Sequence, residues 1–162
     1  MVLRMLTWVV IALAIVSVGL FAYVRLAPIE PERWHVDPIS VEAGNGENQY
    51  LVLPAEERPT GADRASPVIR LPGPAAAAAV DETILMEPRT ERIAGSPDTG
   101  MMTYVTRSAL WGFPDFTTVK VIDRGEAAEL AIFARARDGL KDLGVNQKRV
   151  DNWLSVLDTT IP

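Results

Sequence analysis

Two neighbouring strand-like segments decide the fold of this chain. They read Phe116-Thr117-Thr118-Val119-Lys120-Val121-Ile122 and Ala128-Glu129-Leu130-Ala131-Ile132-Phe133-Ala134-Arg135-Ala136-Arg137. Both segments are rich in β-branched, aromatic or other apolar residues that suit a strand of a folded sheet. The turn-forming residues Asp123-Arg124-Gly125 stand between them. Because strands joined by so short a connection pair in antiparallel fashion, the two segments predict a β-hairpin.

The segments before the hairpin predict further strands. Residues 102–106 are β-rich and precede a turn at residues 112–115, so we expect a third antiparallel strand there. Residues 49–53 predict one more short strand. In the segment from Ala128 onward, alternate side chains point to opposite faces, so one face is apolar and the other carries Phe133, Arg135 and Arg137.

Two helices are predicted beside this sheet. Pro74 suits the first position of a helix, and the alanine run that follows has high helix propensity up to the stop at Glu87-Pro88. Near the C-terminus, Asn146 is a good N-cap for an amphipathic helix. Its apolar stripe has helical spacing and consists of Val150, Trp153, Leu154 and Leu157. The fold class is therefore α+β, a two-layer domain with helices packed on one face of an antiparallel sheet.

The N-terminal segment predicts a membrane anchor. Residues 5–24 contain no charge, and twenty helical residues span about 30 Å, the thickness of the hydrocarbon core of a bilayer. Trp8 and Tyr23 lie near opposite ends, where aromatic rings prefer the interface. The alternatives are a cleaved signal peptide and a buried core helix. The apolar run is longer than a signal peptide requires, and no small-residue cleavage site follows it cleanly.

The anchor divides the chain into three predicted parts. Residues 1–27 form the anchor, residues 28–74 a proline-rich linker with one possible short strand, and residues 75–162 the small α+β domain. Arg4 and the terminal amine favour a cytoplasmic N-terminus. We therefore expect a single-pass protein of the bacterial inner membrane, bound to the bilayer through residues 5–24, with its C-terminal domain in the periplasm.

Composition excludes several kinds of chemistry. The chain has no cysteine, and its single histidine, His35, lies just after the anchor. Cysteine chemistry is therefore excluded, and so are a histidine-based triad and a two-histidine metal site in the domain, unless one residue folds back to it. The formal net charge is −5, with no basic stripe that would bind nucleic acid. We expect no metal, no cofactor and no catalytic residue.

The end of the third strand gathers charged side chains. Arg135 and Arg137 project from one face, and Asp138, Gly139, Asp142, Gly144, Asn146 and Arg149 follow within a short stretch. In one interpretation, ion pairs to Asp138 and Asp142 clamp the turn to the sheet. In the other, Arg107, Arg135 and Arg137 form a site for an anion or a partner, assisted by the helix N-terminus near Asn146.

This stretch resembles a known family. Residues 135–150, with Gly139, Asp142-Leu143-Gly144-Val145-Asn146 and Arg149, are similar to the signature of the family called domain of unknown function 1499. Arg107-Ser108 and Gly112-Phe113-Pro114-Asp115 are similar to its upstream elements, and the likeness covers roughly residues 75–158. Ala134 and Ala136 replace the serines of that signature, and the cysteine-bearing opening segment of many members is missing. The resemblance implies an envelope location and brings no activity.

Three functions fit these observations. The first is a non-enzymatic interaction or accessory subunit of an inner-membrane or envelope complex, which implies a protein partner. The second is a binding domain for an anionic small molecule or a lipid headgroup. The third is a hydrolase that uses carboxylates such as Asp115 and Asp142 as acid and base. The sequence favours the first, because no nucleophile motif accompanies the carboxylates.

Overall fold

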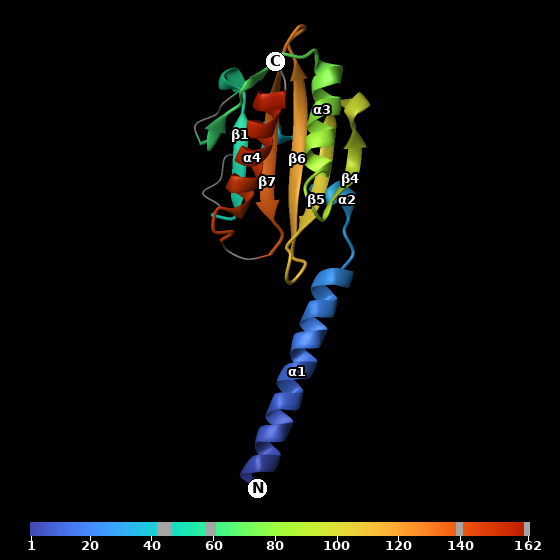
Figure 1. The fold of residues 1–162 in the computed structure, drawn as a ribbon, viewed down its shortest axis with the longest axis vertical. Coiled ribbons are helices and arrows are strands. Elements are labelled where there is room, and N and C mark those ends of the chain that lie inside the picture. The colour runs from blue at the N-terminus through green and yellow to red at the C-terminus, as the bar shows by residue number, and fades with distance from the viewer. Residues whose placement is uncertain (42–46, 58–60, 139–140, 161–162) are drawn as a thin grey trace.

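A long helix leads into one folded domain built around a sheet (Figure 1). The structure is a computed structural model that describes residues 1–41, 47–57, 61–138 and 141–160. The helix α1 spans Val2–Leu26 and leaves the domain at one end. The domain is of mixed helix and sheet, which confirms the predicted α+β class.

The sheet has seven strands, six of them in the order β2-β1-β7-β6-β5-β4, with β3 also paired to β7. Every pair is antiparallel except β1 with β2, which is parallel. The strands are β1 Gln49–Leu53, β2 Arg64–Ala65, β3 Val68–Ile69, β4 Thr90–Ser96, β5 Met101–Arg107, β6 Pro114–Asp123 and β7 Ala128–Ala136. The predicted hairpin is β6–β7, and the predicted third strand is β5.

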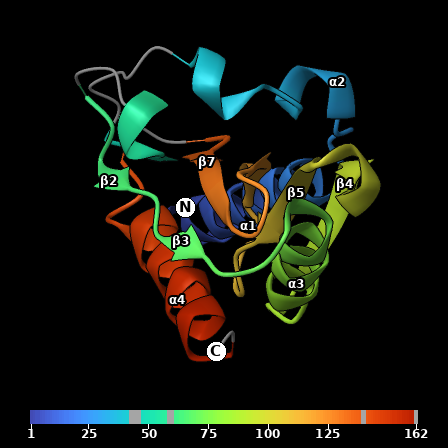
Figure 2. The ribbon, with the colours of Figure 1, turned by 90° about the horizontal axis from the view of Figure 1, so that it is seen from above.

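Helices α3 and α4 cover one face of the sheet (Figure 2). Helix α3 spans Gly73–Leu85 and α4 spans Val145–Thr160. The predicted stripe of α4 is buried against the face of β7 that carries Leu130, Ile132 and Ala134. From α3, the carboxylate of Asp81 accepts a hydrogen bond of 2.8 Å from the buried Tyr104 hydroxyl on β5, which ties this helix to the sheet.

The opposite face of the sheet is also covered, by the segment that follows α1 (Figure 2). This segment, residues 31–41, contains α2 Pro31–Trp34 and the 3₁₀ helix η1 Pro38–Ser40, and we call it the strap. Its Ile39 and Val41 pack against a cluster that includes Leu51, Phe133 and Ala131. Two further 3₁₀ helices, η2 Ala55–Glu57 and η3 Pro97–Thr99, lie in connections.

The strap and the short strands add to what was predicted. Helices were predicted on one face of the sheet, where α3 and α4 pack, and the strap covers a second apolar cluster on the other face. Residues 28–74 were predicted as a linker with one possible strand, yet the described part of this segment contributes β1, β2 and β3 to the sheet. The domain boundary at residue 74 itself stays a prediction.

Helix α1 is long and apolar enough to cross a membrane, and its most apolar stretch of 18 residues is not buried by the rest of the molecule. A core helix of this length would be largely buried. The helix therefore agrees with the predicted anchor at residues 5–24 in length and composition.

The packing of α4 can be tested through Trp153, which lies buried in the main core. We expect Trp153→Ala to lower the free energy of unfolding by about 3–5 kcal/mol, because the truncation leaves a cavity. The exposed Lys148 on the same helix provides the control, and Lys148→Ala should change stability by less than about 0.5 kcal/mol. Urea unfolding of the full chain in detergent measures both. Equal midpoints for the two variants would contradict this packing.

Candidate functional site

The side chain of Arg135 lies between the sheet and the strap. Its Nη2 donates a hydrogen bond of 2.6 Å to the Trp34 carbonyl, and its Nη1 one of 3.3 Å to the Phe133 carbonyl. The guanidinium carbon lies 5.3 Å from the Trp34 ring centroid and 4.4 Å from that of Phe133, within cation–π range. Burial lowers the pKa of Arg135 to about 10. Among the described residues it has no carboxylate partner.

Trp34 joins the strap to the sheet through its ring and its carbonyl. Its ring stacks on Phe116 of β6 with centroids 3.8 Å apart and an interplanar angle of 8°. Its carbonyl also accepts a hydrogen bond of 3.0 Å from the Thr118 hydroxyl. The next residue, His35, bonds through Nδ1 to the Thr103 hydroxyl at 2.8 Å. His35 thus folds back onto the domain, and Arg135 serves as a clamp for this segment.

Arg107 connects the domain to the end of α1. Its Nη1 donates hydrogen bonds of 3.1 Å to the Gly112 carbonyl and 3.5 Å to the Val24 carbonyl. Gly112 belongs to the turn between β5 and β6, so one guanidinium joins this turn to the last turns of α1. Of the three arginines predicted to hold an anion together, Arg107 and Arg135 are therefore engaged by backbone carbonyls.

Arg137 is the arginine with unused hydrogen-bonding capacity. Its Nε forms an ion pair of 2.8 Å with Asp138, while its Nη2 is buried without a hydrogen-bond partner. It lines a cavity of about 370 Å³ between the end of α1, the start of the strap and the end of β7. The other lining residues are Tyr23, Ala27, Pro28, Glu30, Arg33, Trp34 and Asp138. We call this space the juxtamembrane cavity.

Asp115 and Arg149 form a largely buried ion pair of 3.0 Å between β6 and α4. Burial raises the pKa of Asp115, and the charge of Arg149 opposes that rise. Arg149 also donates through Nη1 to the Asn146 side-chain oxygen at 2.9 Å. The Asp115 carboxylate, the Arg149 guanidinium and the Asn146 side-chain oxygen therefore form a network within the fold, while the buried Nδ2 of Asn146 has no hydrogen-bond partner.

Asp142 holds the start of α4. Its carboxylate accepts hydrogen bonds of 2.9 Å from the backbone N–H of Gly144 and of Asn146. Gly144 has φ of +76°, a left-handed conformation that glycine adopts without cost. Asn146 was predicted as the N-cap, but the helix begins at Val145 and the capping carboxylate comes from Asp142. Gly139, the remaining motif residue, lies outside the described residues.

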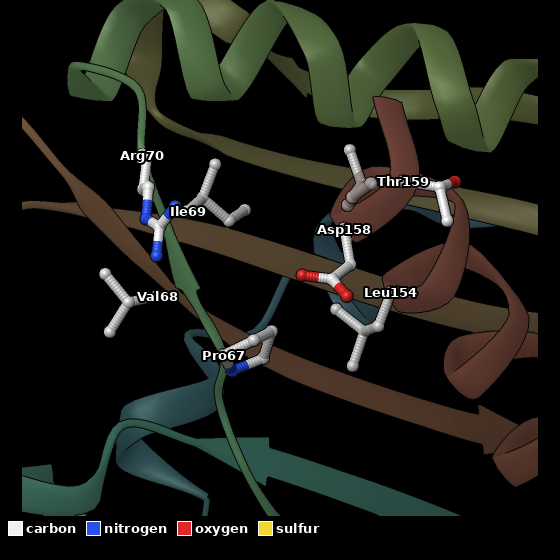
Figure 3. A pocket seen from close by; sticks show the side chains of 8 residues that line it. Pro67, Val68, Ile69, Arg70, Leu154, Asp158 and Thr159 are labelled. Atoms are coloured by element: carbon white, nitrogen blue, oxygen red, sulfur yellow. The ribbon is translucent and has the colours of Figure 1, made fainter. Parts of the chain in front are cut away.

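A second cavity, of about 390 Å³, lies between β3 and the C-terminal half of α4 (Figure 3). Its walls are mixed, with the charged Arg70 and Asp158 among the lining residues; the others are Pro67, Val68, Ile69, Leu154, Leu157 and Thr159. Sequence analysis missed this cavity, because residues 67–70 were assigned to a linker. Within the part of the chain that the structure describes, no group of three or more side chains suited to a metal ion occurs.

The chain matches a known protein family. A family model described as "Protein of unknown function (DUF1499)" matches residues 41–157. No curated protein matches the chain. The match begins well before residue 75, where the resemblance described above begins. It thus includes β1, β2 and β3, in agreement with their pairing into the sheet.

The role of Asp142 can be measured directly. We expect Asp142→Ala to lower the free energy of unfolding by about 1–2 kcal/mol, the usual cost of losing a helix cap. Asp142→Asn keeps one of the two acceptor oxygens, so its loss of stability should be smaller than that of Asp142→Ala. Gly144→Val should cost about 1 kcal/mol or more, because valine resists a positive φ. Thermal melts of the three variants that all coincide with the wild type would mean that this turn is a solvated loop.

Proposed function

The chain belongs to the DUF1499 family of proteins of unknown function, and from its own residues we propose that it is a non-enzymatic accessory protein of the bacterial inner membrane. In this proposal α1 spans the membrane once, the N-terminus is cytoplasmic, and the domain in the periplasm binds a protein partner in or on the same membrane.

The fixed attachment of the domain to its anchor carries this proposal. Trp34 is held by Phe116, Arg135 and Thr118, and Arg107 bonds to the end of α1 at Val24. A domain mounted in this way stays next to the bilayer, where a membrane-bound partner is found at high effective concentration. A flexible tether would serve a domain that searches the periplasm, and the strap removes that freedom.

The two carboxylates considered for a hydrolase both bond to other groups of the fold. Asp115 is paired with Arg149, and Asp142 caps α4 through two backbone N–H groups. A general base needs an acceptor oxygen within reach of a substrate proton. These contacts support a non-enzymatic role.

The juxtamembrane cavity favours a second candidate, the binding of an anionic small molecule or lipid headgroup. Arg33 and Arg137 line it, and the Nη2 of Arg137 has no partner in the fold. A phosphate or carboxylate oxygen would supply an acceptor after a small shift of that side chain. Glu30 and Asp138 also line the cavity, so the site is not purely basic.

Two measurements on the full-length protein test these functions. In spheroplasts, protease added outside should remove a C-terminal tag, and purification in mild detergent should recover a partner that Trp34→Ala retains less well. A tag protected until the membrane is broken, or no reproducible partner in several growth conditions, would contradict the accessory role. For the second candidate, inorganic phosphate should raise the melting temperature of the wild type but not that of Arg137→Gln.

A further inference from the structure

Two turns at the end of the domain from which α1 leaves carry exposed apolar side chains. The turn between β5 and β6 carries Leu110, Trp111 and Phe113, which are 74%, 44% and 36% exposed. The turn that leads from β7 into α4 carries Leu143, which is 85% exposed. In water, this much apolar surface on neighbouring turns is unfavourable.

The turn at residues 108–113 is held by hydrogen bonds within the turn. The Ser108 N–H donates to the Phe113 carbonyl at 2.9 Å, and the Phe113 N–H donates to the Ser108 hydroxyl at 3.0 Å. Gly112 has φ of +77°, and its N–H donates to the Ser108 carbonyl. These bonds hold the backbone in a fixed shape, so the outward position of Leu110 and Trp111 is imposed by the fold.

The same turn is attached to the last turns of α1. The Trp111 ring meets the Phe21 ring edge to face, with centroids 6.3 Å apart. A Cβ atom at Gly112 would lie 3.2 Å from Cγ and Nε of Arg25, so the absence of a side chain lets the anchor approach. The turn therefore lies beside the C-terminal end of the apolar run of α1. In a helix that crosses a membrane, this end lies at the membrane–water interface, where tryptophan is enriched.

The backbone conformation and the exposure of Leu143 give a second, independent observation. Its φ is +55°, a conformation that costs a leucine about 1 kcal/mol or more, and its side chain is nevertheless left in solvent. The Asp142 cap and Gly144 on either side fix this geometry. A strained backbone that presents an apolar side chain outward is explained if something covers that side chain.

We infer that these two turns form a second contact with the bilayer, in which Leu110, Trp111 and Leu143 enter the headgroup and upper acyl region beside α1. The occupant is lipid because the turn packs on the very helix that crosses the membrane, which brings the bilayer surface to it. Interfacial segments of this kind bury apolar side chains about 5–10 Å into the headgroup–acyl boundary. The inference rests on the proposed function, since it requires α1 to lie in a membrane.

Because the chain has no cysteine, single cysteines can report each position. We would label Leu110→Cys, Leu143→Cys, Val68→Cys and Leu13→Cys with bimane and reconstitute the full chain in vesicles of phosphatidylethanolamine and phosphatidylglycerol. Val68 is the matched control: it is apolar and 63% exposed, and it pairs with Glu129 at the start of β7, the opposite end of the strand from Ala136. Leu13 lies in the middle of α1.

Lipids that carry a nitroxide near the headgroup should quench the labels at Leu110 and Leu143, while iodide in the water should quench only the label at Val68. If iodide quenches Leu110 and Leu143 as it does Val68, the second contact is absent, and the anchor stands as long as Leu13 is quenched by nitroxide deep in the acyl chains. Labels at Leu110 and Leu143 shielded from both quenchers would mean that protein covers the turns, which overturns the inference. A Leu13 label open to iodide would overturn the proposed function and this inference together.

Discussion

The contact of Trp34 with the sheet is the interaction on which the rest of the structure depends. The ring stacks on Phe116, and its carbonyl accepts hydrogen bonds from Arg135 and Thr118. Aromatic stacking adds about 0.5–1.5 kcal/mol beyond burial, and a desolvated cation–π contact about 2 kcal/mol. These contacts hold the strap over the second face of the sheet. They also bring α1 to one end of the domain, where Arg107 and the turn that carries Trp111 contact its last turns.

The local parts of the fold could be predicted from sequence, because neighbouring residues determine them. The β6–β7 hairpin, the amphipathic α4 and the apolar α1 each follow from a periodic pattern within one segment. The strand β1 was also predicted, at residues 49–53, but its pairing with β7 and the strap could not be predicted in this way. Gln49 pairs with Arg135, and Trp34 packs on Phe116, across separations of more than eighty residues. A proline-rich composition describes a linker and a strap equally well, and only the distant partner distinguishes them.

The candidate site shows the same limit at the level of single side chains. Arg107, Arg135 and Arg137 are one residue type and were all predicted on the sheet, yet the first two bind backbone carbonyls and the third lines a cavity. The sequence does not indicate which backbone carbonyls will lie within hydrogen-bonding distance of each arginine. Local chemistry was more informative at the turn before α4, where the sequence singled out Asp142 and Gly144: the Asp142 carboxylate accepts two backbone N–H bonds, and Gly144 has a positive φ. The capping carboxylate is that of Asp142, and Asn146 is not the N-cap, because the helix already begins at Val145.

The central claim is that the strap fixes the domain to its anchor. Spin labels on Leu26→Cys and Val68→Cys, in full-length protein reconstituted in bilayers, give the distribution of distances between the two parts by pulsed dipolar spectroscopy. Both residues are exposed, and the chain has no other cysteine to interfere. A fixed mounting predicts one narrow distribution that broadens when Trp34→Ala removes the stack. A broad distribution with Trp34 in place would show that the domain swings on its anchor, and would contradict this account.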